Sequence, residues 1–583
     1  MNDLELKQLK DNLWNAADKM RSSAHLAANK YGQPILGLIF LRYADILYKQ
    51  HKDEIEAEYN KNKGKRTEKS IKDISLEKCG FYLPECAYYD YINNSPKNAK
   101  KATVVKLAME AIEQENENFE GVLPKDVYAQ LVPEEDPELL SDIVQIFKDI
   151  PEDISIDLFG EIYEYFLGNF ALSEGKDGGT FYTPASVVKY MVEVIKPEAG
   201  DKKFLDPACG SCGMGVQTAR YMHKHNASAS ETMKFRFYGV EKEPETVRLG
   251  KMNLLLNNLR GEITEANSFY SDPYNAVGNF DYLLSNPPFN VDEVVYERVK
   301  DDDRFKAYGI PKNKTESKKK DSGKKETVPN ANYLWINYFI TCLKEKTGRG
   351  GFVMANSASD AGKSELEIRR KIIESGIIKQ MVTLPSNMFT SVTLPATLWF
   401  IDKAKVNTDK KDEILFIDAR NIFTQIDRAH RKFSDEQIKN LSVITRLYEG
   451  DAKAFNDLIK EYEDNKKKLD NPDYWQEQID WLNDRFPDGE YQDVIGLCKV
   501  AKIGATYDDA GEIIEIEEDS ISDQDWSLNP GRYVGVVIED DGMTKEEFKE
   551  TITDLNSQLT ELNREAKQLE SEISNNLERL FGE

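Results

Sequence analysis

Residues 202–225, KKFLDPACGSCGMGVQTARYMHKH, decide how the middle of this chain folds. The apolar pair Phe204-Leu205 ends at Asp206, and a turn with three glycines leads into a stretch whose apolar residues recur at helical spacing. This order predicts a strand, a tight turn and a helix. Because glycine lets a ligand approach the backbone closely, the turn is also a candidate binding site.

Short apolar runs continue through residues 175–405 and alternate with amphipathic stretches. The further runs are RFYGVE (236–241), FDYLLS (280–285), GGFVMANS (350–357), IKQMVTLP (378–385) and TLWFIDK (397–403). Such alternation is typical of parallel strands joined by crossover helices. We therefore expect an α/β fold with a doubly wound Rossmann-like sheet, whose ligands bind outside the C-terminal ends of the strands.

The length of 583 residues exceeds what one hydrophobic core organises, so several domains are expected. Helical spacing dominates the beginning of the chain, as in LGLIFLRYADILYKQ (36–50) and SIDLFGEIYEYFLGNFA (155–171). The predicted parts are a helical domain at 1–165, the sheet domain at 166–425, a mixed and partly helical region at 426–540 and a C-terminal coiled-coil helix at 541–583.

The last part of the chain carries a heptad seam, in which spacings of four and three alternate. Its members are Phe548, Ile552, Leu555, Leu559, Leu562, Ala566, Leu569, Ile573, Asn576 and Leu580. The polar Asn576 could set the register. The seam predicts a coiled-coil arm that contacts a partner, and the alternative is a helix packed on its own domain.

Residues 311–328, PKNKTESKKKDSGKKETV, interrupt the strand–helix alternation. They are polar, lysine-rich and without periodicity, which predicts a mobile loop. The loop is either a solvated linker or a segment that folds over a polyanion.

The charge balance is acidic, because 103 Asp and Glu against 77 Lys and Arg give a net charge of −26. A protein that binds nucleic acid on its own is usually basic. Either nucleic acid is irrelevant here, or a partner supplies much of the phosphate contact.

Six cysteines in a chain of this length do not form a disulfide framework and fit a reducing compartment. The N-terminus lacks a signal-peptide pattern, and the apolar run Pro34–Leu41 is too short for a membrane span. We expect a cytoplasmic protein with no membrane contact.

The glycine turn differs from the common phosphate-binding loops. It has no Gly-Lys-Ser/Thr ending, and it lacks the full dinucleotide fingerprint around Gly210 and Gly213. Cys209 and Cys212 form a C-x-x-C pair, but no second closely spaced pair exists to complete a zinc site. We interpret both cysteines as small turn residues and predict no metal.

Two polar residues follow the next predicted strands. Glu241 ends RFYGVE, where a carboxylate could accept from both hydroxyls of a ribose; the alternative is a charge that favours the helix start at Pro244. Asn267 stands where a third strand should end, and it either pairs with an adenine edge or caps a turn. Turn, ribose carboxylate and adenine contact describe an adenosine site without a pyrophosphate cradle, and S-adenosylmethionine is the common cofactor of that description.

The sequence Asn286-Pro287-Pro288-Phe289 leaves another strand at the same edge of the predicted sheet. The prolines remove two amide donors and stiffen the chain. The Asn286 side-chain oxygen and the Pro287 carbonyl can then accept hydrogen bonds from one exocyclic amine, while Phe289 offers a flat face to a planar base. The alternative is a strand-ending turn with one core phenylalanine, which the preceding glycine turn disfavours.

These motifs resemble those of the modification subunit of type I restriction–modification systems, an S-adenosylmethionine-dependent DNA adenine-N6 methyltransferase. The sequence 286–289 resembles the catalytic motif of this family. The sequence DPACGSCGMG (206–215) resembles its cofactor motif, although Cys212 stands where glycine is more usual. Glu241 matches the ribose-binding acid, and Asn267 stands where an aspartate is commoner.

The likeness covers nearly the whole chain, from LWNAADKM (13–20) through GGTFYTPASVV (178–188) to DWSLNPGRYVG (525–535). It implies a class I methyltransferase sheet with an all-α N-terminal domain and a C-terminal helical arm. The implied cofactor site comprises Thr180, Phe181, Tyr182, Thr183, Pro184 and Ala185 at the methionine end, together with Asp206, Gly210, Ser211, Cys212, Gly213, Glu241 and Asn267. The implied catalytic residues are Asn286, Pro287, Pro288 and Phe289.

The resemblance also implies partners. Two modification subunits would embrace one specificity subunit that reads double-stranded DNA, and a restriction subunit would complete a nuclease. Two alternatives remain open at this point. An Asn-Pro-Pro-aromatic motif also suits a glutamine-N5 or RNA methyltransferase, and the chain could be a non-catalytic scaffold that binds the cofactor.

Overall fold

A computed structural model describes the chain except for residues 1–2, 24–27, 67, 96–98, 132–137, 155, 174–182, 226–230, 232–233, 258, 313–325, 390–394, 428–429, 469–470, 538–548, 550–551, 561, 565, 568, 570–572 and 574–583. Its contacts divide the chain into a larger compact unit, Met1–Val534, and a smaller one, Gly535–Glu583. The predicted residues Thr180, Phe181 and Tyr182 and most of the lysine-rich loop lie outside the described residues.

The N-terminal region is helical, as the spacing of its apolar residues predicts. Its helices are α1 (Asp3–Ser23), α2 (Ala28–Asn62), α3 (Ile71–Cys79), α4 (Tyr89–Asn94), α5 (Ala99–Glu115), α6 (Leu139–Lys148) and α7 (Ile156–Ser173), with 3₁₀ turns η1 (Glu85–Ala87), η2 (Glu117–Phe119) and η3 (Tyr128–Leu131). Their shared core includes Met252 and Leu256 from a helix of the sheet domain, and the Tyr43 hydroxyl donates to the Leu256 carbonyl at 2.7 Å. The helical region is therefore packed directly on the sheet domain.

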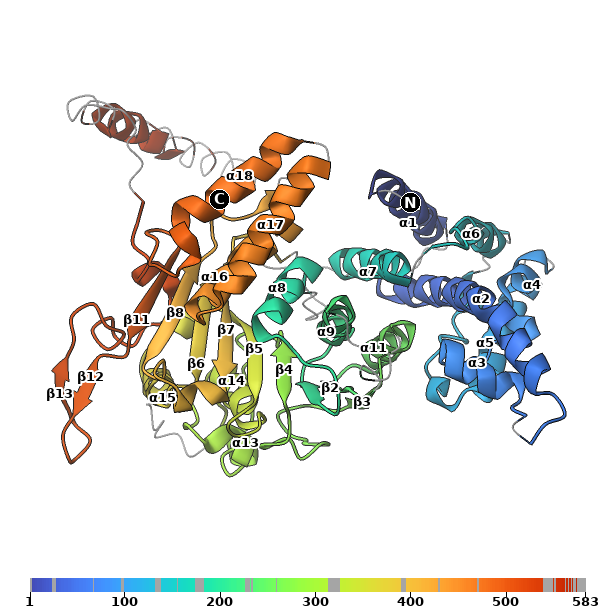
Figure 1. Cartoon of the computed structure of the whole chain (residues 1–583), viewed down its shortest axis with the longest axis horizontal. Coiled ribbons are helices and arrows are strands. Elements are labelled where there is room, and N and C mark those ends of the chain that lie inside the picture. Colours follow the sequence, from blue (N-terminus) through green and yellow to red (C-terminus); the bar gives the residue numbers. More distant parts are fainter. Residues whose placement is uncertain are drawn as a thin grey trace, which may run out of the picture. The chain divides into compact units, whose positions relative to one another are not determined.

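Among the described residues, nine strands form one sheet in the order β11-β8-β6-β7-β5-β4-β1-β2-β3 (Figure 1). The strands are β1 (Lys203–Asp206), β2 (Arg236–Glu241), β3 (Gly261–Glu265), β4 (Tyr282–Ser285), β5 (Arg349–Ala355), β6 (Ile378–Thr383), β7 (Ala396–Asp402), β8 (Glu413–Asp418) and β11 (Cys498–Lys502). Two hairpins, β9 (Thr424–Gln425) with β10 (Arg431–Lys432) and β12 (Ala505–Tyr507) with β13 (Ile513–Ile516), lie outside this sheet. The predicted α/β class and the strand positions quoted above are confirmed.

The prediction of parallel strands throughout is wrong for β7. This strand runs antiparallel to both of its neighbours, β5 and β6. The pairs β1–β2, β1–β4, β2–β3, β4–β5 and β6–β8 are parallel. A parallel return needs a crossover of a dozen or more residues, usually with a helix. The described part of the link between β6 and β7 holds no helix, so the chain turns back instead.

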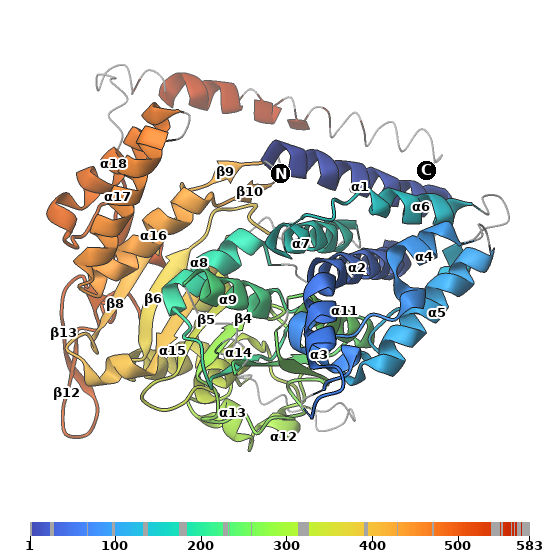
Figure 2. The same ribbon diagram turned by 45° about the vertical axis from the view of Figure 1, so that its right-hand side comes forward.

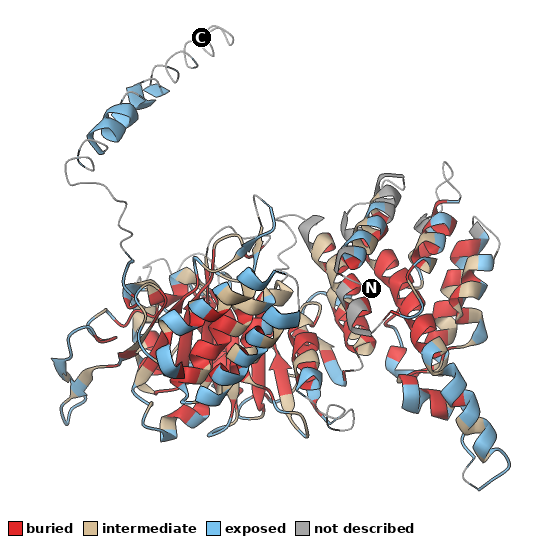
Figure 3. Ribbon diagram, turned by 45° about the horizontal axis from the view of Figure 1, so that its top comes forward, coloured by how far each residue is buried: buried red, intermediate tan, exposed pale blue. Residues whose placement is uncertain are grey.

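Helices cover both faces of the sheet, so its strands are buried on both sides (Figures 2 and 3). One core holds residues of α8 (Ala185–Ile195), α9 (Gly213–Lys224), α11 (Pro244–Leu256), α16 (Asp435–Tyr448), α17 (Ala452–Lys468) and α18 (Pro472–Arg485). The opposite core holds residues of α12 (Tyr296–Val299), α13 (Asp303–Lys306), α14 (Asn332–Thr341) and α15 (Ser364–Glu374). Successive strand residues alternate between them: Phe204 faces the first core and Leu205 the second.

The regions beyond residue 425 extend the sheet domain. β11 pairs antiparallel with β8, although it lies in the region predicted to be separate. The predicted domain boundaries stay predictions. In the smaller unit, the described seam residues are helical and about half exposed, with Leu555 54% and Leu562 60% exposed. Phe548, Asn576 and Leu580 lie outside the described residues, and the coiled-coil arm stays a prediction.

We expect Gly215→Ala to destabilise the fold, because α9 crosses β2 closely at this glycine. A Cβ there would lie 2.6 Å from Cδ2 and 2.8 Å from Cε2 of the Phe237 ring. Forcing the buried ring to move should cost about 1–3 kcal/mol, measured by chemical denaturation. Gly213→Ala is the matched control in the same helix: a Cβ there meets nothing within 4 Å, so stability should hold or rise. Equal stability of the two variants would contradict this account of the packing.

Candidate active site

The strand order reverses beside β1, which pairs with β2 on one side and with β4 on the other. Ligands of doubly wound sheets bind in the crevice at such a switch point, outside the C-terminal ends of the strands. Asp206 ends β1 and Ser285 ends β4, and the Ser285 hydroxyl donates to Asp206 Oδ1 at 2.8 Å. Both side chains are buried. The two motifs predicted from the sequence therefore meet where a ligand should bind.

The glycine turn opens onto free space. Gly210 has a φ of +50°, and a Cβ at either Gly210 or Gly213 would meet nothing within 4 Å. Cys212, the N-cap of α9, has a φ of 65°, the left-handed region that favours glycine. Glycine adopts this conformation without steric cost, which explains why it is more usual at this position in the family whose cofactor motif this turn resembles.

The cysteine pair is enclosed. Burial raises the pKa of both the Cys209 and Cys212 thiols, so neither is readily ionised. Across the described ranges of the chain, no group of three or more His, Cys, Asp or Glu side chains could hold a metal ion.

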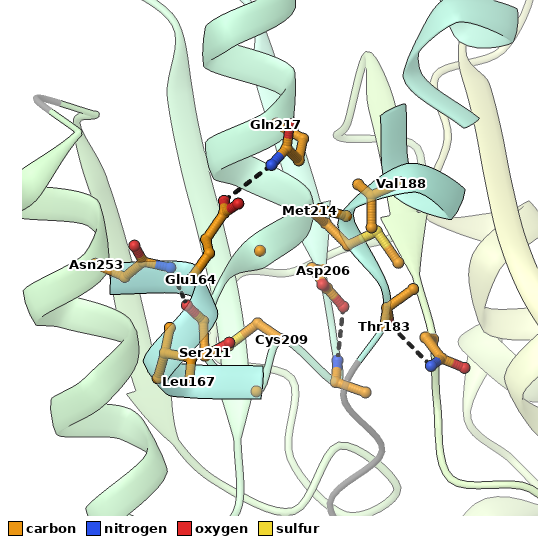
Figure 4. A pocket seen from close by; sticks show the side chains of 15 residues that line it. Glu164, Leu167, Thr183, Val188, Asp206, Cys209, Ser211, Met214, Gln217 and Asn253 are labelled. Atoms are coloured by element: carbon orange, nitrogen blue, oxygen red, sulfur yellow. Dashed lines mark hydrogen bonds between the residues drawn. The ribbon is translucent and has the colours of Figure 1, made fainter. Parts of the chain in front are cut away.

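A cavity of about 60 Å³ lies at the switch point (Figure 4). It brings together seven of the predicted site residues: Thr183, Ala185, Asp206, Gly210, Ser211, Gly213 and Asn286. These residues come from the start of α8, the end of β1, the glycine turn and the residue after β4. The predicted catalytic and cofactor motifs thus share one cavity.

Asn286 has an unusual hydrogen-bonding state. Its Nδ2 donates to Thr183 Oγ1 at 2.8 Å. Its Oδ1 is buried and has no hydrogen-bond partner among the described residues, and the whole residue is 9% exposed. A buried acceptor without a donor costs about 1–3 kcal/mol, a cost that an N–H or O–H group of a ligand at this oxygen would offset.

The other predicted residues of the catalytic motif do not line the cavity. Pro287 is buried, while Pro288 and Phe289 are partly buried. Phe289 packs against the core on the α8 and α9 face of the sheet. Pro184 is the N-cap of α8 and holds the cavity residues Thr183 and Ala185 at its start.

Glu241 and Asn267 lie outside the cavity. Glu241 Oε2 accepts from the Gly210 backbone amide at 3.1 Å, and Oε1 accepts from the amides of Lys242 and Glu243. The acid thus lies against the glycine turn and also precedes α11. Asn267 Oδ1 accepts from the Phe269 amide at 3.0 Å, which is the turn-capping role weighed above.

Asp206 is a buried carboxyl group of the site whose pKa is strongly shifted. Burial raises its pKa to about 7, against the lowering effect of the hydrogen bonds from Ser285 and the Ala208 amide, and Glu241 raises it further. A carboxyl group in this state is sensitive to any cation that enters the cavity.

Eight lining residues are not among the predicted site residues: Glu164 and Leu167 on α7, Val188 on α8, Ala208 and Cys209 in the turn after β1, Met214 and Gln217 on α9, and Asn253 on α11. Asn253 Nδ2 donates to the Ser211 carbonyl at 2.7 Å and so holds the glycine turn. In the sequence, Glu164 stands out only as the one acidic residue in the apolar helical stretch IYEYFLGNFA (162–171). Helical spacing alone does not show that this residue lies beside a glycine turn more than 40 residues later.

Two family descriptions match the chain: N-6 DNA methylase over residues 154–484 and HsdM N-terminal domain over residues 9–147. The type I restriction enzyme MjaIX methylase subunit from Methanocaldococcus jannaschii is 33% identical over 98% of this chain and 91% of its own length. The HindI methylase subunit from Haemophilus influenzae is 30% identical over 83% of this chain and 94% of its own length.

Solved structures share the fold. A type I restriction–modification methyltransferase subunit from Streptococcus thermophilus aligns with a TM-score of 0.64 at 19% identity, covering 91% of this chain and 99% of that chain. A chain solved in work on complex assembly of the type I system aligns with a TM-score of 0.51 at 18% identity, covering 98% of each chain. Sheet and helices thus form an α/β methyltransferase fold.

The chain belongs to the N-6 DNA methylase family, and within it to the methylase subunits of type I restriction enzymes. Every helix in the described part of the chain is too short or too polar to span a membrane.

We expect Asp206 to make stability fall as pH rises. Its folded-state pKa of about 7 lies above the ordinary value of 3.8, so the folded state binds more protons between those values. The free energy of unfolding then decreases as pH rises through this window and levels off above it. Asp206→Asn keeps the hydrogen-bond acceptor but cannot ionise. Its stability advantage over the wild type should grow from pH 5 to pH 8 by at most about 3 kcal/mol.

Thermal midpoints of both proteins across that range measure the effect. Parallel curves for wild type and Asp206→Asn would mean that Asp206 is ionised throughout, and would contradict the assignment.

Proposed function

We propose that this methylase subunit transfers a methyl group from S-adenosylmethionine to the exocyclic N6 amine of an adenine in double-stranded DNA. The observation that carries the proposal is the unpartnered Asn286 Oδ1, buried in the cavity where β1 and β4 end. An exocyclic amine is a donor that would satisfy this acceptor.

The residues present fit the cofactor. Asp206 and the open glycine turn at Gly210 and Gly213 would hold its methionine side, together with Thr180–Ala185, Ser211 and Cys212. A cavity of about 60 Å³ is far below the roughly 300–1,000 Å³ of a complete small-molecule site. The ribose and adenine would therefore lie outside the cavity, and we assign them to Glu241, which lies against the glycine turn, and to Asn267. When bound, the cofactor supplies an electrophilic methyl group on a sulfonium.

The chain's own residues position the nucleophile. Asn286 Oδ1 and the Pro287 carbonyl accept hydrogen bonds from the two amine hydrogens, which directs the nitrogen lone pair at the methyl group. Thr183 Oγ1 accepts from Asn286 Nδ2 and so fixes which way the amide points. The amine would release its extra proton to solvent only after the nitrogen has attacked, so no strong base is needed. Orientation of this kind can contribute roughly 7–11 kcal/mol.

The target adenine must leave the base stack, at a cost of a few kcal/mol, to reach Asn286. Phe289 would stack on it from the end of the motif. Because Phe289 is packed against the core and only partly exposed, one of its edges or faces would be offered to the base.

The net charge of −26 makes unaided DNA binding unfavourable. We propose that a specificity subunit reads the DNA sequence and supplies much of the phosphate contact, with two copies of this chain per specificity subunit. A restriction subunit would complete the enzyme, which would act in the cytoplasm and protect host DNA. The relatives are subunits of type I restriction enzymes by name, which supports assembly of this kind.

Labelled cofactor separates the candidate substrates. The complex reconstituted with its specificity subunit should transfer label to adenine in double-stranded DNA, and not to RNA or to a glutamine-bearing release-factor peptide. Label in RNA or peptide alone would overturn the proposal, and so would absence of transfer to any of them.

We expect Asn286→Ala to bind the cofactor with nearly unchanged Kd and to lose methyl transfer. Without the amide, the amine loses one of its two acceptors, and misplacement of this kind lowers kcat by about 100-fold or more. Asn169→Ala is a control, because Asn169 lies on α7 and its amide donates to the Tyr165 carbonyl outside the cavity. Unchanged transfer by Asn286→Ala would refute the catalytic role.

Thr183→Val should lower kcat at saturating cofactor by roughly tenfold, because the Asn286 amide loses the acceptor that orients it. Thr183→Ser retains the hydroxyl and should keep nearly the wild-type rate. Single-turnover transfer assays measure both variants. Equal rates for valine and serine would show that this hydrogen bond does not orient the amide.

A further inference from the structure

The last helix of the N-terminal region forms one wall of the active-site cavity. Glu164 and Leu167 on α7 line it, opposite residues that belong to the sheet domain. Figure 4 shows the Glu164 carboxylate on one side of Asp206 and Thr183 on the other. The cavity is thus incomplete without the helical region.

One carboxylate oxygen of Glu164 fastens α7 to α9. Oε1 accepts from Gln217 Nε2 at 2.8 Å and from Arg220 Nη1 at 3.1 Å. Arg220 lies against Gly160 of α7, where an added Cβ would come within 2.1 Å of Nη2. Arg220 Nη2 also donates to Asn257 Oδ1 at 3.3 Å. The position of Glu164 is therefore set by a network that joins α7, α9 and the C-cap residue of α11.

The other oxygen, Oε2, makes no hydrogen bond to any residue that the structure describes, and the side chain is 14% exposed. Glu164 lines the cavity, and Oε2 is the carboxylate oxygen that the contacts with Gln217 and Arg220 leave without a partner. The described lining contains two carboxylates, Glu164 and Asp206, and no Lys, Arg or His. Such a lining favours a cationic ligand group.

We propose that Glu164 is a cofactor-binding residue: its Oε2 accepts a hydrogen bond from the α-ammonium group at the methionine end of the cofactor. The proposal rests on the proposed function, since it takes S-adenosylmethionine as the ligand of this cavity. It adds a binding residue from the helical region, so that cofactor binding joins the two regions.

The ammonium suits Glu164 better than the sulfonium does. An ammonium has three N–H donors, whereas a sulfonium has none and cannot satisfy a carboxylate oxygen by hydrogen bonding. The methyl group must also point toward Asn286, whose amide donates to Thr183 Oγ1. Thr183 lies on the other side of Asp206 from Glu164 (Figure 4). The amino-acid end is then left to reach α7.

Three ligands titrated by calorimetry into the full-length chain test the proposal. S-adenosylmethionine has both cationic groups, S-adenosylhomocysteine retains only the ammonium, and 5′-methylthioadenosine lacks the amino-acid end. Glu164→Gln preserves an oxygen for Gln217 and Arg220 but removes the charge. It should weaken the first two ligands by about tenfold or more and leave methylthioadenosine unchanged.

Glu193→Gln is the matched control, because Glu193 on α8 faces Lys224 at 3.8 Å and does not line the cavity. It should bind all three ligands as the wild type does. The ratio of the Kd values for methylthioadenosine and S-adenosylmethionine is read within each variant, so partial unfolding does not alter it.

Each other outcome overturns the proposal. Equal weakening of all three ligands would show that Glu164 acts only through the contact of α7 with α9. Weakening of S-adenosylmethionine alone would place the carboxylate at the sulfonium, and no weakening would remove it from the site. A wild-type chain that binds none of the three would instead refute the proposed function.

Discussion

The hydrogen bond from Ser285 to Asp206 is the contact on which the site depends. It joins the ends of β1 and β4, the two strands between which the sheet reverses its order. One partner begins the glycine turn, and the other immediately precedes Asn286. Because the bond is buried, it fixes the distance between the two motifs to which we assign cofactor binding and positioning of the nucleophile, without competition from water. Neither the strand order nor either motif alone would create the cavity.

The residues at and beside this contact lower the stability of the free protein. Asp206 is buried with its pKa raised, and Asn286 Oδ1 lacks a donor. Both features destabilise the free protein, and each would be relieved by a different ligand group: a cationic group beside the carboxylate and an amine hydrogen at the amide oxygen. Strain of this type gathers where function requires it. The helical region contributes through α7, whose Glu164 is held by Gln217 and Arg220 on α9. The site is therefore built from residues of both the helical region and the sheet domain.

Much of the fold could be predicted from local pattern, because apolar runs and glycine turns act over a few residues. The strand before Asp206, the helix after Gly213 and the break at Pro287 are all of this kind. The direction of β7 could not be predicted, because an apolar run looks the same in a parallel and in an antiparallel strand. Glu164 was missed because its neighbours in space come from α9 and α11, and only tertiary packing brings them together. The predicted roles of Glu241 and Asn267 depend on where their side chains point, and the structure shows backbone amide partners for both.

A structure of the full-length chain bound to S-adenosylhomocysteine tests the central claim most directly. We predict the ligand sulfur in the cavity between Asp206 and Asn286, with the ribose hydroxyls toward Glu241 and the ammonium toward α7. A ligand seated elsewhere, such as the groove beside β3 lined by Arg260 and Glu262, would contradict the account. So would a ligand in the cavity with the Asn286 amide turned away from the sulfur.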